Sequence, residues 1–253
     1  MLAKDLLLHY RALSEQSFTV VDLETTGQAP PEDRVIEVSI VQASLKEGVQ
    51  QQQTHLINPG VPIPPYIQRF TGISADMIEA APHAQEVWQE CLPLLNSGIL
   101  TAHHIDFEYG FIQTEYARLG INFVRPAPAQ LCTVILSRLM LPDLASRSLP
   151  FLVNHFEFPV DCSHRAEPDA LACWLLAEKL LKEIQTEADE VLLARFAKQR
   201  MPLEGVADLL ECSAEVALTR LNNAGVIPKI SRRTETAMYM RGDVEVILLE
   251  GSN

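Results

Sequence analysis

The chain has 253 residues, of which 47% are hydrophobic and 21% are charged, so it has enough apolar material for a folded core and is not mainly disordered. Its formal net charge of −13 argues against non-specific binding along duplex nucleic acid, which depends on neutralising phosphates with basic residues. The sequence has no run of 18 apolar residues, no CxxC among its five cysteines and no secretory signal pattern at residues 1–10. We therefore expect a cytoplasmic protein with reduced thiols and no membrane span.

Strands are predicted early in the chain, and helices become more frequent further along it. Strands are predicted at residues 19–23, 35–45 and 51–57, and a Pro-rich loop follows at 62–65. This order favours an α/β or α+β layer fold with a mixed sheet. Beyond the loop we expect helices at 75–79, 85–95, 107–119, 132–141, 149–156 and 169–184, and a strand at 99–102.

A polar, charged stretch at residues 185–190 predicts a boundary between two domains, 1–185 and 186–253. The second domain resembles a winged helix-turn-helix, whose third helix, at 214–224, ends at Gly225. That helix exposes polar side chains that could contact nucleic acid, but docking to a protein partner is an equally good interpretation. The other expected elements are helices near 192–197 and 202–210, strands at 226–230, 236–240 and 244–249, and a hairpin turn at Arg241-Gly242-Asp243.

The first chemical motif lies at the end of the strand at 19–23. Asp22 and Glu24 are two residues apart, so on a strand both carboxylates point to the same face. Adjacent carboxylates repel each other unless a cation lies between them, and Mg²⁺ prefers oxygen ligands. Gly27 allows a tight turn and the close approach of a substrate backbone. Taken alone, the pattern is better explained by solvated acids on an edge strand.

Two further clusters change that balance. Residues 102–111 (AHHIDFEYGF) lie where a strand is followed by a helix, and residues 164–170 (HRAEPDA) lie at the start of a long helix. Asp169 follows Pro168 in the first helical turn, where the helix dipole favours an anion. His164, on the preceding loop, is either a general base beside a metal-binding aspartate or an ordinary exposed histidine.

In this order the three motifs resemble those of the DEDDh-type 3′→5′ exonucleases. This DnaQ-like group includes the proofreading epsilon subunit of DNA polymerase III and ribonuclease T. The group's D-x-E-T-T-G motif matches residues 22–27, and its H-R-A-x-x-D-A motif matches residues 164–170. Its A-H-N-x-x-F-D-x-x-F segment matches residues 102–111, with His104 in place of Asn and Glu108 in place of Asp. The resemblance extends over roughly residues 15–185.

The resemblance implies a ribonuclease H-like fold, a mixed five-stranded sheet with helices on both sides, and phosphodiester hydrolysis with two Mg²⁺ or Mn²⁺ ions. The implied substrate is the 3′ end of single-stranded DNA or RNA, released as nucleoside 5′-monophosphates. His164 is the implied general base. The implied metal ligands are Asp22, Glu24, Glu108 and Asp169, with Asp106 as the alternative to Glu108.

The residues that would hold the substrate are less closely defined by the sequence. Thr26 and Gly27 could offer backbone N–H groups to the terminal nucleotide, and Phe70 or Phe107 could stack on a base, although core packing is the better interpretation of Phe107. The competing hypothesis is a non-catalytic nucleic-acid- or partner-binding protein on a degenerate nuclease fold. The His164–Asp169 pair favours the enzyme, because a binding module does not need a base beside a metal site.

Overall fold

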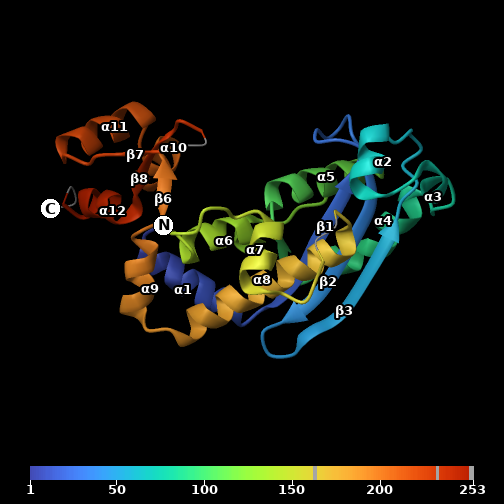
Figure 1. Cartoon of the computed structure of the whole chain (residues 1–253), viewed down its shortest axis with the longest axis horizontal. Helices are drawn as coiled ribbons and strands as arrows, with labels where there is room; N and C mark the ends of the chain where they lie inside the picture. Colours follow the sequence, from blue (N-terminus) through green and yellow to red (C-terminus); the bar gives the residue numbers. More distant parts are fainter. Residues whose placement is uncertain (162–163, 232–233, 251–253) are drawn as a thin grey trace. The chain divides into compact units, whose positions relative to one another are not determined.

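The computed structural model describes residues 1–161, 164–231 and 234–250, with no side-chain description for Glu250 (Figure 1). It divides into two compact units. The large unit comprises Leu13–Leu136 and Ser146–Lys182, and the small unit comprises Met1–Ala12, Ser137–Ala145 and Glu183–Asn253. The change of unit at residues 182 and 183 lies close to the expected domain boundary at 185, but two segments from the first 185 residues belong to the small unit.

The large unit is built on a five-stranded mixed sheet, as predicted from the family resemblance. The strand order is β3-β2-β1-β4-β5, with β1, β2 and β3 antiparallel and with β4 and β5 parallel to β1. The prediction of a ribonuclease H-like sheet is thereby confirmed. The strands are β1 (Ser17–Thr25), β2 (Val35–Ser44), β3 (Gly48–Leu56), β4 (Ile99–Ala102) and β5 (Gln130–Cys132).

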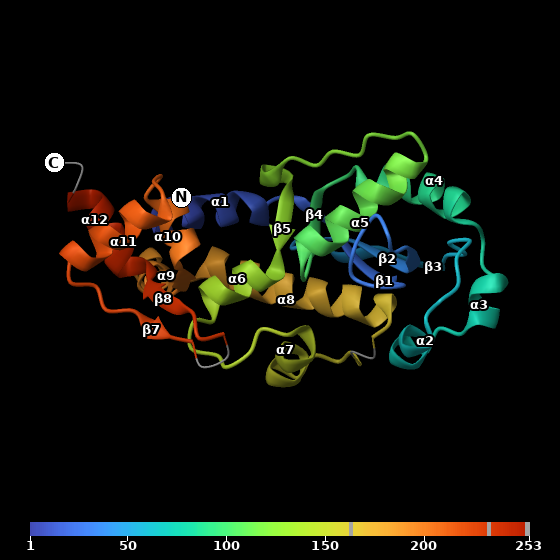
Figure 2. The ribbon, with the colours of Figure 1, turned by 90° about the horizontal axis from the view of Figure 1, so that it is seen from above.

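The two faces of β1 have different partners. Val21 and Leu23 point into a hydrophobic cluster that also contains Trp88 of α4 (Ala84–Leu95) and Phe111 of α5 (Ile105–Arg118). The opposite face meets α8 (Ala166–Thr186), where the ring of Phe18 lies 5.6 Å from that of Trp174. Figure 2 shows α4 and α5 on one side of the sheet and α8 on the other. Asp22 and Glu24 have the parity of Phe18, so they lie on the α8 face.

Most helices of the large unit fall where the periodicity predicts them. An exception is α2 (Pro65–Thr71), which begins inside the expected Pro-rich loop. Pro65 occupies the first helical turn, where its missing N–H has no cost, and Gly72 ends the helix with φ +73°. The remaining helices in these segments are α3 (Ala75–Glu79), α4 (Ala84–Leu95), α5 (Ile105–Arg118), a short 3₁₀ turn (Ala127–Ala129), α6 (Thr133–Met140), α7 (Leu149–Phe156) and α8 (Ala166–Thr186).

The small unit combines helices with a three-stranded sheet of order β6-β8-β7. The predicted strand at 244–249 is wrong, and so is the predicted hairpin turn at 241–243, because both lie in α12. Buried Val244 and partly buried Ile247 and Leu248 recur at helical spacing and pack on one hydrophobic cluster. The elements are α1 (Ala3–Ser14), α9 (Asp189–Phe196), β6 (Arg200–Pro202), α10 (Leu203–Leu209), α11 (Ala214–Asn223), β7 (Lys229–Ile230), β8 (Ala237–Met240) and α12 (Arg241–Glu250).

Two sequence expectations concern composition rather than topology. None of the helices in the described ranges is both long enough and apolar enough to span a bilayer. Cys91, Cys132, Cys173 and Cys212 are free thiols, as expected, while Cys162 lies outside the described residues. The winged-helix assignment of the C-terminal residues stays a prediction.

Candidate metal centre and active site

Three carboxylates from two distant segments of the sequence meet on the α8 face of the sheet. Asp22 and Glu24 come from β1, and Asp169 comes from the first turn of α8. One carboxylate oxygen from each lies within 4.8 Å of the others. The strand delivers two acids to one face because its side chains alternate, and the helix places the third at its positive end.

The second motif contributes one carboxylate from the start of α5. Glu108 is only 5% exposed, whereas Asp106, two residues earlier, is exposed to solvent. A two-residue step on a helix turns through roughly 200°, so the two side chains leave the helix on nearly opposite sides. Among the causes that raise the pKa of Asp22, burial comes first and the charge of Glu108 second. Glu108 is therefore the residue of this motif that lies beside the cluster.

Burial and mutual repulsion make these acids reluctant to ionise together. The pKa of Asp22 is raised well above its ordinary value by burial, and then by the charges of the neighbouring carboxylates. Burial, followed by the charges of Asp169 and Glu37, raises the pKa of Glu24 to about 8, although Arg165 opposes the shift. Burial also raises the pKa of Glu108 to about 8. Such a cluster is a strong candidate for a cation site.

The donor set fits a hard divalent cation. All four side chains offer carboxylate oxygens, which Mg²⁺ and Mn²⁺ prefer, and none of the four is a sulfur or nitrogen donor. Oε2 of Glu108 is buried and has no hydrogen-bond partner within the described residues. An unpartnered buried carboxylate oxygen is costly unless another group satisfies it, and a bound cation would do so.

His164 lies at the surface next to an aromatic side chain of α2. It has φ +54°, a rare conformation for a residue other than glycine. Its ring stacks on that of Phe70, with 4.0 Å between the ring centroids. The structure thus joins His164 to Phe70, two residues that the sequence assigned to different roles.

The loop that follows the D-x-E motif is held by its own hydrogen bonds. The N–H of Thr26 donates to the carbonyl of Arg34 (2.8 Å), and the Thr26 hydroxyl accepts from the N–H of Arg34 (2.9 Å). The N–H of Thr26 is therefore not available to a nucleotide, contrary to expectation. A Cβ on Gly27 would clash with the Asp33 carboxylate, so a larger residue here would have to displace that side chain. The substrate-binding hypothesis for this loop now depends on Gly27.

The aromatic candidates differ in exposure. Phe70 is 56% exposed on α2, and Tyr66 on the same helix is also 56% exposed, with its hydroxyl 3.5 Å from the carbonyl of Thr26. Phe107 is partly buried, packs on the hydrophobic cluster and lies 4.9 Å from the ring of Phe111. Core packing thus accounts for Phe107, while Phe70 and Tyr66 remain accessible. Tyr66 was not among the predicted site residues, and no helix was expected at residues 65–71.

Sequence reasoning also missed a partly buried ion pair beside the cluster. Glu37 of β2, which is 1% exposed, pairs with Arg165 of the H-R-A motif. In the β1–β2 register, Glu37 is directly opposite Glu24. A second ion pair, between Arg34 and the buried Glu115, lies where the loop after the D-x-E motif joins β2. Its Arg34 Nε is 2.8 Å from Glu115 Oε1. No local pattern could have revealed either pair, since their members are 128 and 81 residues apart.

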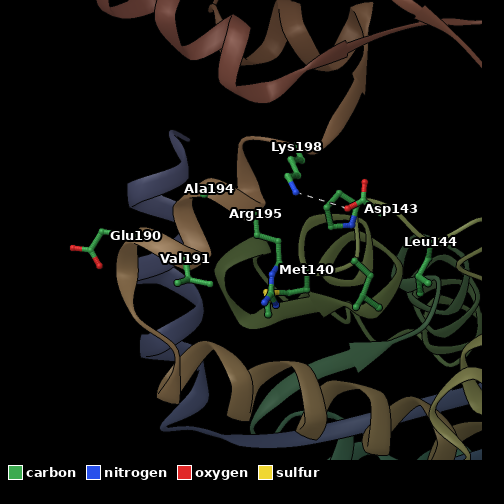
Figure 3. Close-up of a pocket in the computed structure, with 10 residues that line it drawn as sticks. Met140, Asp143, Leu144, Glu190, Val191, Ala194, Arg195 and Lys198 are labelled. Carbon is green, nitrogen blue, oxygen red and sulfur yellow. Dashed lines mark ion pairs between the residues drawn. The ribbon is translucent and has the colours of Figure 1, made fainter.

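The small unit has a groove of its own (Figure 3). The groove has a volume of about 700 Å³ and lies between α9 and the segment at residues 140–144. Lys198 and Asp143 form an ion pair of 4.0 Å at its rim. The four carboxylates of the candidate metal centre belong to the large unit, whereas the residues that line the groove belong to the small unit. Its lining is Met140, Leu141, Pro142, Asp143, Leu144, Glu190, Val191, Ala194, Arg195 and Lys198.

Comparison with known families agrees with this geometry. The exonuclease family model RNase T matches residues 19–176, which include all four carboxylates and His164. The DNA polymerase III PolC-type of Caldanaerobacter subterraneus subsp. tengcongensis is 32% identical over 205 residues, covering 78% of this chain and 14% of that protein. The 3′-5′ exonuclease DinG of Bacillus subtilis is 32% identical over 175 residues, covering 68% of this chain and 18% of that protein. The chain thus spans less than a fifth of the length of these relatives.

Solved structures show the same fold at low sequence identity. The nuclease domain of 3′hExo, a DEDDh family member bound to rAMP, has a TM-score of 0.54 and 14% identity, covering 66% of this chain and 92% of that chain. E. coli exonuclease I in complex with a dT13 oligonucleotide has a TM-score of 0.58 and 16% identity, covering 72% of this chain and 43% of that chain. The five-stranded sheet and its flanking helices are therefore shared with nucleases.

Proposed function

This chain belongs to the RNase T exonuclease family, and on that premise we propose that it is a metal-dependent 3′→5′ exonuclease. The observation that carries the proposal is the meeting of Asp22, Glu24 and Asp169 within 4.8 Å, with buried Glu108 beside them. Without a bound cation, four adjacent carboxylates repel one another when all are ionised, and two divalent ions would offset that repulsion. Asp22, Glu24, Asp169 and Glu108 hold these ions, Mg²⁺ or Mn²⁺, in this proposal.

The proposed chemistry is phosphodiester hydrolysis at a 3′ end. The bound ions supply charge stabilisation for the attacking and leaving oxygens of the displacement. His164 accepts the proton of the attacking water, a role suited to a histidine on an exposed loop that precedes the aspartate of α8 by five residues. The leaving group is the shortened strand, and the product is a nucleoside 5′-monophosphate.

The proposed substrate is single-stranded DNA or RNA. Phe70 and the backbone N–H of Gly27 face the terminal nucleotide, and stacking on an aromatic ring accepts any base. The net charge of −13 disfavours long non-specific contacts with a duplex. Support also comes from similar structures, in which exonuclease I holds dT13 and 3′hExo holds rAMP. We also propose that residues 186–253 bind a partner, either nucleic acid or protein.

The test is a degradation assay on single-stranded DNA and RNA of one sequence, labelled at either the 5′ or the 3′ end. We expect the 5′-labelled strand to shorten stepwise, and the 3′-labelled strand to release a labelled mononucleotide at once, with Mg²⁺ or Mn²⁺ but not with EDTA. The matched control is Asp22→Asn, which keeps the side-chain shape and removes a proposed ligand of both ions. Strand binding without degradation by the parent protein would support the non-catalytic hypothesis instead.

A further inference from the structure

The segment that carries His164 and Asp169 is fastened to the sheet by one buried carboxylate. Glu37 of β2 accepts hydrogen bonds from Nε of Arg165 at 3.1 and 3.0 Å and from Nη2 at 2.5 Å. Its Oε2 also accepts the backbone N–H of Ala166, the first residue of α8, at 2.9 Å. Glu37 therefore binds the side chain of the H-R-A motif and caps the helix that follows it.

These contacts determine where two residues of the proposed site stand. Arg165 follows His164 directly, and the N–H of Asp169 donates to the carbonyl of Arg165 at 3.3 Å within the first turn of α8. Glu37 is also opposite Glu24 in the strand register. Glu37 thus lies opposite Glu24 of β1 and also holds the segment that carries His164 and Asp169.

The charge of the pair matters as much as its geometry. Glu37 is a fifth acid beside four others, and Arg165 neutralises it with a planar, two-pronged contact. Arg165 also acts electrostatically on Glu24, so a displaced Arg165 is a candidate competitor for the cation. With Glu37 in place, the guanidinium is held by the Glu37 carboxylate on β2.

We propose that Glu37 and Arg165 are positioning residues that assemble the metal centre by fixing the H-R-A segment and the start of α8 against β2. Neither residue is a metal ligand in this scheme. The inference rests on the proposed function for its catalytic consequence, but its effect on cation binding can be measured without any turnover. Residues outside the ligand shell that orient ligands typically change metal affinity or activity by about 10–100-fold.

The experiment measures Mn²⁺ binding by electron paramagnetic resonance, together with kcat and KM on a single-stranded oligonucleotide. Glu37→Gln keeps the size of the side chain but offers an amide where two donors converge. Arg165→Lys keeps the charge but loses the two-pronged contact, and is the milder variant if Glu37→Gln does not fold. We expect both to raise the Kd for Mn²⁺ by about 10–100-fold and to lower kcat, with KM changed less than threefold.

The matched control is Glu178→Gln, which breaks the exposed Lys182–Glu178 pair (2.8 Å) on the same helix and should leave all three quantities at parent values. Thermal melts in EDTA report the folded fraction of each variant. Folded variants that bind Mn²⁺ and turn over like the parent would overturn the inference and leave the pair a purely structural contact. An inactive parent would refute the proposed function, while the Mn²⁺ affinities of parent and variants would still decide the role of the pair.

Discussion

The metal-free protein should lose stability as the pH rises from 5 to 8.5. Glu24 and Glu108 each have a pKa near 8 in the folded chain, against an ordinary value of 4.5. Between these values the folded protein holds protons that the unfolded chain has released, so the free energy of unfolding falls with rising pH. The stabilising contribution is complete below about pH 4.5 and is lost by about pH 8.

The size of the effect follows from the same shifts. At about 1.4 kcal/mol per pKa unit, the shift of the buried Glu108 alone contributes on the order of 5 kcal/mol, and Glu24, where solvent screens the charge more, adds a smaller amount. That is a large part of the roughly 5–15 kcal/mol by which a domain is stable, and corresponds to a melting-temperature change of roughly 10–20 °C. Mg²⁺ should restore stability strongly at pH 8.5 and little at pH 5, because only ionised carboxylates bind it.

The assay is thermal unfolding at pH 5, 6.5 and 8.5, in EDTA and in Mg²⁺. Glu108→Gln is the control, since it removes one titrating group of the cluster and should flatten the pH dependence measured in EDTA. A melting temperature that rises from pH 5 to 8.5 in EDTA would refute the reasoning. An identical slope in the parent and in Glu108→Gln would show that other groups dominate.

Three further variants test single residues of the site. His164→Ala should lower kcat by about 10²–10⁴-fold while leaving the Kd for Mn²⁺ unchanged, because its proposed role is proton transfer; loss of Mn²⁺ binding would make it a ligand instead. Phe70→Ala should raise KM for an oligonucleotide by the factor that corresponds to losing about 1–3 kcal/mol of stacking free energy, with a smaller change in kcat. An unchanged KM would remove Phe70 from the substrate site. Gly27→Ala should displace Asp33, whose carboxylate accepts from the Thr26 hydroxyl and the Ala29 N–H, and lower both the melting temperature and kcat/KM; added Asp33→Ala should relieve the clash but not replace the lost hydrogen bonds.

The parts of the site that the sequence predicted depend on short-range geometry. Asp22 and Glu24 share a face because any strand alternates its side chains, and Asp169 stands in the first turn because Pro168 starts helices well. The same local rules predicted β4 and α7 at their observed bounds. The family resemblance then supplied the five-stranded sheet, which periodicity alone indicated only as a mixed layer.

The parts that the sequence did not predict depend on distant contacts or on ambiguous local signals. Glu37 gave no motif of its own, because its role requires Arg165, which is 128 residues away. The helix α2 was not predicted because three prolines near its start indicated a loop, although Pro65 is compatible with a first helical turn. The alternating, β-branched run at 244–249 favoured a strand, but burial of Val244 with the partly buried Ile247 and Leu248 selects a helix. Tertiary packing decides such cases.

The unusual second motif gives the sharpest remaining test of the metal centre. Glu108 is buried, and one of its oxygens has no hydrogen-bond partner in the described part of the chain, whereas Asp106 is exposed on the other side of α5. Glu108→Gln should therefore reduce kcat by more than the roughly 10–100-fold that losing an outer partner costs, and Asp106→Asn should have little effect. Glu108→Asp, which restores the family's usual residue, should retain activity, since it keeps the carboxylate on a shorter arm.

Turnover of one single-stranded oligonucleotide by the three variants in parallel decides the assignment. Melting temperatures in EDTA at pH 8.5 provide an independent readout, because Glu108→Gln removes a repelling buried charge and should raise stability, while Asp106→Asn should not. A severe loss in Asp106→Asn with full activity in Glu108→Gln would reverse the roles of the two acids. Near-parent turnover in both variants would mean that Asp22, Glu24 and Asp169 hold the ions without the help of α5.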